Sequence, residues 1–315
     1  MDVSQSIFSI IFMVEFIVGN IGNGFIALVN CVDWIKRRNI SALSQILIAL
    51  AISRIGFLWL VLLNWWASVF YSDLLTTGNI IRMIYITWTV ISHFSNWLAT
   101  CLSIFYFLKI ANFTNSFFLY LKWRVREMVL VTLLSSLILL FLNIIIINTH
   151  IDIWIDGTKR NTSDIKFSKF LLFPNLMFNF IPFTVTLAVF LLLIFSLWKH
   201  LKNMWHNAHR SGHVNTTAHI KALQTVVAFL LLYTIYLLSI LTQVWKFEFL
   251  DEDLIIFFGQ SVVLAFPSGH SCILILVDSK LQQTFLSVMW WLRCYSPQMW
   301  IPYIHKTFGG LFCVF

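Results

Sequence analysis

Hydrophobic residues gather into seven long stretches that are apolar on every helical face. Each stretch is at least as long as the roughly 20 residues that an α-helix needs to cross a bilayer. A membrane β-barrel would instead show short segments of alternating hydrophobicity. The pattern predicts an all-α membrane protein, a single seven-transmembrane helix bundle over residues 1–315 with a tail at 278–315. The predicted spans are about 7–32, 43–69, 83–108, 128–149, 172–198, 222–244 and 254–277.

The composition is typical of a chain whose solvent is lipid. Hydrophobic residues make up 59% of the chain and charged residues 11%, whereas soluble domains have about 45–50% and about 25%. The first stretch lacks the basic region of a secretory signal, because Asp2 is acidic and Glu15 interrupts the apolar run. We therefore expect the first span to be retained, with no ligand-binding ectodomain before it.

The distribution of Lys and Arg between the loops predicts the direction of the spans, because cytoplasmic loops carry an excess of these residues. An extracellular amino terminus places fourteen of the 21 Lys and Arg residues inside and six outside, with Arg54 within the second span. The second outside loop is the exception, since it carries four of those six. We predict a cytoplasmic carboxyl terminus, and the formal charge of +8 then reflects topology, not nucleic-acid binding.

Four Asn-x-Ser/Thr sequons test this orientation, at Asn39, Asn112, Asn161 and Asn215. Only Asn161 falls outside the cell in the predicted topology, so it is the expected glycosylation site. The alternative is that this sequon is unused.

Arg54 is a charged residue near the middle of the second span. Insertion scales put the cost of a central arginine at about 2.5–3.5 kcal/mol, so it should face the bundle and have partners. The candidates are Asn20 and Asn23 of the first span and polar groups of the seventh, such as Ser271. Two interpretations remain open: Arg54 ties three helices together, or it acts as a switch with two arrangements.

The third span carries a polar and aromatic stripe. Trp88, Ser92 and Asn96 recur every four residues and so share one helix face. Tyr236 of the sixth span and Gln260 of the seventh add aromatic and hydrogen-bonding groups. This mixture suits a mostly apolar organic ligand, although polar groups that hold helices together would produce the same pattern.

Two motifs that suggest catalysis or metal binding lack the partners they need. Pro267–His270 matches a phosphate-binding segment of membrane lipid phosphatases, but the Arg-Pro segment of those enzymes is missing. His206, His209 and His213 have helical spacing without a Cys or carboxylate in the same loop. Glu15 is the only acid deep in a span, which disfavours a transporter. We predict no enzymatic activity, no metal and no cofactor.

Several stretches, at matching membrane depths, are similar to those of one receptor family. They are Gly19–Asn20, NGFIALVN at 23–30, LIALAISR at 47–54, HFSNWLAT at 93–100, FYFLKIANF at 105–113, SLWKHLKNM at 196–204, HIKALQT at 219–225 and HSCILILVDSKLQQTFLSV from His270. Over roughly 1–290 the chain resembles the type 2 taste receptors, the bitter-taste G-protein-coupled receptors. It also lacks the Asp-Arg-Tyr, Asn-Pro-x-x-Tyr and extracellular cysteine features of rhodopsin-like receptors.

The resemblance implies roles for individual residues. Trp88 and Tyr236 fall at ligand-contacting positions of the family, and Ser92 stands where several members have Asn. Some members have Glu where Gln260 stands, so we expect less preference for cationic alkaloids here. Asp278 stands where members usually have Asn. The residues of the inner polar network would be Asn23, Arg54, Ser271 and Asp278.

The expected mechanism is a ligand-driven population shift between helix arrangements. The resemblance implies bitter small-molecule agonists, a plasma-membrane location and a gustducin-like heterotrimeric G protein. Residues expected to face that G protein are Lys109, His200, Lys202 and Lys221. The alternatives are a pheromone-type seven-helix chemoreceptor, whose usual extracellular cysteines are missing here, and a multipass membrane enzyme or transporter.

Overall fold

The computed structural model is helical throughout the residues that it describes, and their secondary structure contains no strand. The described residues are 3–38, 41–70, 78–111, 113, 115–159, 167–208, 217–244 and 252–295. The helices are α1 (Val3–Arg37), α2 (Ala42–Phe70), α3 (Gly78–Ile110), α4 (Ser116–Trp123), α5 (Val125–Lys159), α6 (Phe167–Ala208), α7 (Thr217–Val244), α8 (Glu252–Val277) and α9 (Ser279–Tyr295).

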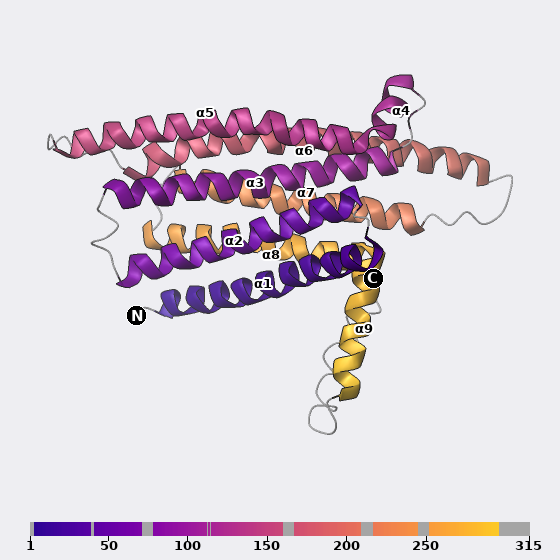
Figure 1. The fold of residues 1–315 in the computed structure, drawn as a ribbon, viewed down its shortest axis with the longest axis horizontal. Coiled ribbons are helices and arrows are strands. Elements are labelled where there is room, and N and C mark those ends of the chain that lie inside the picture. Colours follow the sequence, from indigo (N-terminus) through magenta and orange to yellow (C-terminus); the bar gives the residue numbers. More distant parts are fainter. Residues whose placement is uncertain are drawn as a thin grey trace. The chain divides into compact units, whose positions relative to one another are not determined.

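The chain divides into two compact units, of which the first is a bundle of long helices (Figure 1). This unit runs from Met1 to Ile273, and the second from Leu274 to Phe315. Within the bundle, α3 packs against α2, α5 and α6, while α1 packs on α2 and α7 packs on α6. α3, which carries more polar residues than the other predicted spans, therefore lies at the centre of these contacts.

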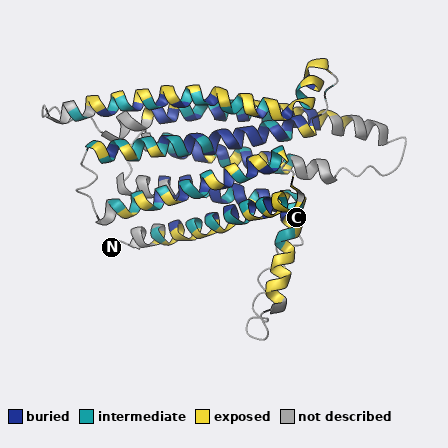
Figure 2. Ribbon diagram, in the orientation of Figure 1, coloured by how far each residue is buried: buried dark blue, intermediate teal, exposed yellow. Residues whose placement is uncertain are grey.

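Large apolar side chains are exposed on the outside of the bundle, whereas several polar side chains are buried among apolar ones inside it. Figure 2 shows exposed residues along the outer helices α1 and α5. Ile21 and Leu28 are 68% and 64% exposed, whereas Arg54 and Thr100 are completely buried. Polar groups avoid the hydrocarbon because an unsatisfied hydrogen-bonding group there costs several kcal/mol. The outer surface of the bundle is therefore suited to contact lipid.

Among the described residues, five helices contain segments long and apolar enough to cross a membrane, and a sixth is counted if Ser261–Val277 and Ser279–Arg293 are taken together. α3 does not qualify because Ser92, His93, Ser95 and Asn96 lower its mean hydropathy. The five segments are Ser9–Lys36, Ala42–Ala67, Val125–Ile153, Phe173–Lys199 and Leu223–Leu241. A multi-helix membrane bundle is thus established.

Each of the seven predicted ranges lies within one helix of the structure. Two helices were not predicted, α4 between the third and fourth ranges and α9 in the tail. The Asn115 side chain caps α4 by accepting a hydrogen bond of 3.1 Å from the Phe117 amide. The rest of the predicted tail, 296–315, lies outside the described residues.

Candidate functional site

A polar seam joins α3 to α6 through three pairs of buried side chains. The hydroxyl of Thr89 lies 3.1 Å from Asn175 Oδ1, and the Asn96 amide donates to Asn179 Oδ1 over 2.8 Å. The third pair, between the hydroxyls of Thr100 and Thr186, is 2.9 Å apart. Residue numbers rise in the same direction along both helices, so α3 and α6 run parallel.

Asn96 also connects this seam to α7. Its Nδ2 lies 3.5 Å from the Tyr236 hydroxyl, and both residues are buried. Asn96 and Tyr236 were predicted to belong to one site, and the structure brings them together. Their partner Asn179 was not predicted, because the fifth predicted span is apolar on every face apart from isolated polar residues.

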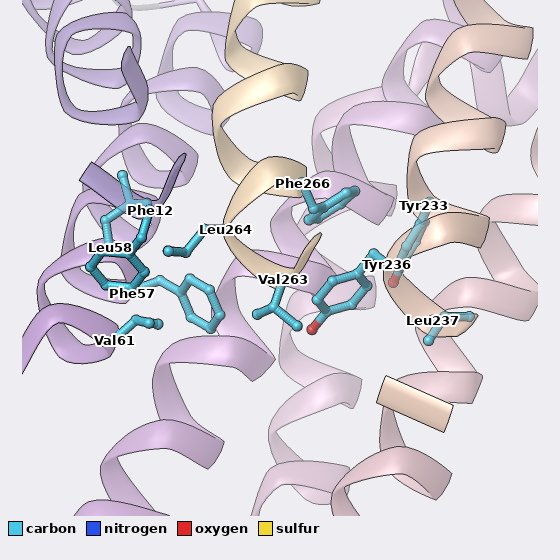
Figure 3. Close-up of a cluster of buried hydrophobic side chains, with 10 residues drawn as sticks. All are labelled: Phe12, Phe57, Leu58, Val61, Tyr233, Tyr236, Leu237, Val263, Leu264 and Phe266. Atoms are coloured by element: carbon cyan, nitrogen blue, oxygen red, sulfur yellow. The ribbon is translucent and has the colours of Figure 1, made fainter. Parts of the chain in front are cut away.

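Tyr236 of this junction also belongs to a cluster of buried aromatic and aliphatic side chains, called the aromatic cluster below (Figure 3). The Phe266 ring stacks on Tyr233 and Tyr236, with ring centroids 5.1 and 4.8 Å apart. Stacked aromatic rings gain about 0.5–1.5 kcal/mol beyond their buried area. The cluster consists of Phe12, Phe57, Leu58, Val61, Tyr233, Tyr236, Leu237, Val263, Leu264 and Phe266.

The predicted ligand-contacting residues of α3 differ in their surroundings. Trp88 is half-buried against the aromatic cluster, with its ring centroid 5.0 Å from that of Phe57. Ser92 is buried, and its hydroxyl lies 2.7 Å from the Trp88 carbonyl oxygen within the same helix. That bond occupies the only hydroxyl proton of Ser92. Gln260 belongs to α8, but its side chain lies outside the described part of the chain.

Arg54 is completely buried and pairs with His270, a polar residue of the seventh predicted span. Its Nη1 lies 2.7 Å from His270 Nδ1, and its guanidinium carbon lies 5.6 Å from the centre of the Phe266 ring. In the sequence, His270 belongs to the phosphatase-like motif and begins one of the family-like stretches, and it was not singled out as a partner of Arg54. Among the described residues, Arg54 Nε and Nη2 have no hydrogen-bond partner. The pair links α2 to α8.

The three residues expected to contact Arg54 form other hydrogen bonds. Ser271 Oγ lies 2.7 Å from Asn23 Oδ1, which ties α8 to α1. The Asn20 amide donates to the Phe16 carbonyl oxygen within α1 instead. The partner of a buried membrane arginine depends on how each helix is rotated about its axis. Residue spacing along one span does not define that rotation. The predicted polar partner from the seventh span is present, but it is His270 and not Ser271, and the side-chain amides of Asn20 and Asn23 donate to other groups.

Close packing brings α1 and α8 together at Gly19. The Ser268 hydroxyl lies 2.9 Å from the carbonyl oxygen of Glu15. A Cβ atom on Gly19 would lie 2.5 Å from Ser268 Oγ and 2.8 Å from Leu58 Cδ1. Small residues at such points allow membrane helices to approach closely.

Asp278 belongs to the second compact unit, where it caps α9. Its Oδ1 accepts hydrogen bonds of 3.0 Å from the amides of both Lys280 and Leu281. An aspartate at this position satisfies donors of the first helical turn that otherwise have no partner. The structure thus gives Asp278 a local role in starting α9.

The residues expected to face a G protein are described in part. Lys109 and Lys202 are exposed, and their ammonium groups lie over the rings of Phe105 and Trp198 at 5.9 and 5.5 Å. The side chains of His200 and Lys221 lie outside the described residues, as does Asn161 entirely.

The chain matches the family model described as Taste receptor protein (TAS2R) over residues 1–293. It is 56% identical to taste receptor type 2 member 140 of Rattus norvegicus over 89% of this chain and 92% of the relative. It is 52% identical to taste receptor type 2 member 14 of Homo sapiens, over 97% and 98% of the two chains. The chain therefore belongs to the type 2 taste receptor family, the bitter-taste G-protein-coupled receptors, which are multipass membrane proteins and not enzymes.

Proposed function

We propose that the chain crosses the plasma membrane seven times, with its amino terminus outside and residues 278–315 in the cytoplasm. The excess of Lys and Arg in the predicted inside loops supports this direction. The parallel course of α3 and α6 supports the count, because an odd number of crossings must lie between two parallel spans. α5, which packs against both helices, provides that single crossing.

The function that the geometry supports best is detection of a bitter small molecule in a pocket open to the outside. The observation that carries it is the junction of Asn96, Asn179 and Tyr236, where polar atoms from three helices meet beside an aromatic cluster. Trp88 packs against that cluster from α3. Aromatic walls with a few convergent polar groups suit a ligand that is mostly apolar. The proposed contacts are Trp88, Ser92, Asn96, Tyr236 and Gln260.

The ligand would act by binding the active helix arrangement more tightly than the inactive one. The pairs Arg54–His270 and Asn23–Ser271 hold α8 to its neighbours and could each adopt a second arrangement. Separation of the inner ends of α6 and α7 then opens a basic surface to a gustducin-like G protein. That surface would include Lys109, His200, Lys202 and Lys221. Nothing in this mechanism requires a metal or cofactor.

Two tryptophan substitutions test the pocket in cells that express the receptor with a chimeric G protein. A calcium-response screen of bitter compounds first identifies an agonist. Trp88→Ala should then raise the half-maximal agonist concentration about 30-fold, because a central aromatic contact is worth about 2 kcal/mol. The matched control is Trp59→Ala, since the Trp59 ring is half-exposed on the outer surface of α2. Equal potency of Trp88→Ala and the parent, at equal surface expression, would exclude the pocket.

Glycan mapping tests the orientation independently of any ligand. Enzymatic removal of N-linked glycan should increase the electrophoretic mobility of the parent chain but not that of Asn161→Gln. A glycan on Asn215 would place the predicted third inside loop outside the cell and would overturn the orientation.

A further inference from the structure

The short helix α4 carries an exposed apolar face although it lies outside every candidate span. Four of its large side chains are exposed: Phe117 by 67%, Leu119 by 45%, Tyr120 by 55% and Trp123 by 86%. Trp123 follows Leu119 by four residues and Tyr120 by three, so these three side chains share one helix face. An apolar surface of this kind normally contacts another molecule.

The opposite face of α4 is anchored to the end of α3. Phe118 is buried, and its ring packs edge-on against Phe107 and Phe113, with centroids 5.5 and 5.1 Å apart. Lys122 donates a hydrogen bond of 3.3 Å to the Ala111 carbonyl oxygen. Because one face is held in this way, the outward direction of the other face is defined by the fold.

Positive charge borders the exposed face. The Arg124 guanidinium lies over the Tyr120 ring at 5.1 Å and forms an ion pair of 2.9 Å with Glu127. Arg126 is exposed as well. Lys122, Arg124 and Arg126 outnumber the single nearby acid Glu127, which leaves a net charge of +2 (3 − 1). The chemical partner should therefore combine an apolar region with negative charge.

The place of α4 selects a bilayer surface as that partner. α4 lies beside the end of α5 (Figure 1), and a candidate span begins at Val125, directly after α4 and its capping residue. Leu130 and Leu134 of that span are 56% and 55% exposed, as expected of a lipid-facing surface. Figure 2 shows exposed residues on α4 next to the beginning of α5, so that the two helices form one continuous exposed surface.

We propose that α4 is an interfacial anchor that binds anionic phospholipid. Tyr120 and Trp123 lie at headgroup level, where amphipathic aromatic side chains concentrate. Arg124 and Arg126 contact the negative headgroups, and each cation near such a surface strengthens association about fivefold. Assignment to the cytoplasmic leaflet rests on the orientation proposed above. A docked G protein subunit is the competing occupant.

Tryptophan quenching by brominated lipid tests the anchor on the full-length receptor in nanodiscs. The fluorescence of Trp123 is obtained as the difference between the parent and Trp123→Phe. Nanodiscs are made from dibrominated phosphatidylcholine, with or without dibrominated phosphatidylserine. Because both leaflets are present and no agonist is added, the result depends on neither the proposed pocket nor the orientation.

We expect dibrominated lipid to quench Trp123, and quenching to increase when phosphatidylserine is present. Arg124→Gln with Arg126→Gln should abolish this increase but leave quenching by phosphatidylcholine. Trp59→Phe provides the matched control, since its exposed ring should be quenched equally by both lipids. Aqueous iodide that quenches Trp123 in every nanodisc, with protection only after purified G protein is added, would overturn the proposal in favour of protein docking.

Discussion

Gly19 and Gly24 offer the same substitution at two positions of one helix with opposite expected results. A Cβ atom at Gly19 would meet Ser268 Oγ at 2.5 Å and Leu58 Cδ1 at 2.8 Å, whereas a Cβ atom at Gly24 has nothing within 4 Å. Neither neighbour of Gly19 can move freely. The Ser268 hydroxyl is held by hydrogen bonds to the carbonyl oxygens of Glu15 and Leu264. The side chain of Leu58 is completely buried.

The magnitude follows from the difference between the two variants. Overpacking a tight contact costs about 1–3 kcal/mol, while the gain in helix propensity on replacing Gly by Ala is common to both positions. Gly19→Ala should therefore be about 1–3 kcal/mol less stable than Gly24→Ala. At about 2–4 °C for each kcal/mol, the melting temperatures should differ by roughly 2–12 °C.

The assay is thermal unfolding of the two purified variants in one detergent, followed by a thiol-reactive dye or by intrinsic fluorescence. Adding Ser268→Ala to Gly19→Ala removes the nearer clash and should recover part of the lost stability. Equal melting temperatures for Gly19→Ala and Gly24→Ala would refute the close packing of α1 on α8.

Three further results are expected from the same thermal assay and from amide exchange. Asn96→Ala and Asn179→Ala should be non-additive by about 0.6–1.7 kcal/mol, the range for hydrogen bonds between membrane helices; additive losses would exclude their bond. His270→Ala should destabilise the receptor by about 1.5–3 kcal/mol, because Arg54 loses its hydrogen-bond partner. His270→Gln should retain part of the stability that His270→Ala loses. Asp278→Ala should speed amide exchange in the first turn of α9, with a capping loss of about 0.5–2 kcal/mol, whereas unchanged exchange would contradict the cap.

The helices were predictable because their signal is repeated over many residues. Long apolar runs identify membrane helices, and spacing by four places Trp88, Ser92 and Asn96 on one face. α4 was missed because eight residues are too few for periodicity to distinguish a helix from a loop. Its cap at Asn115 was the available signal.

Partners between helices were less predictable, because spacing along one helix says nothing of how a second helix is rotated. The structure brings Asn96 and Tyr236 together, and likewise Asn23 and Ser271. For Arg54, a polar partner from the seventh span was predicted with Ser271 as the example, and the structure identifies this partner as His270. The position of one histidine in an apolar helix does not indicate which side chain of another helix it contacts.

The three pairs of the seam between α3 and α6 restrict how these helices can move. A one-turn slide would displace either helix by about 5.4 Å, and the bonds at Asn175, Asn179 and Thr186 would all break together. Pro182 lies within α6 between the second and third of these residues, and a proline removes one backbone hydrogen bond of its helix. Bending there costs less than sliding. Asn175 and Asn179 hold the part of α6 before Pro182, and bending at Pro182 would break only the Thr100–Thr186 pair of the seam.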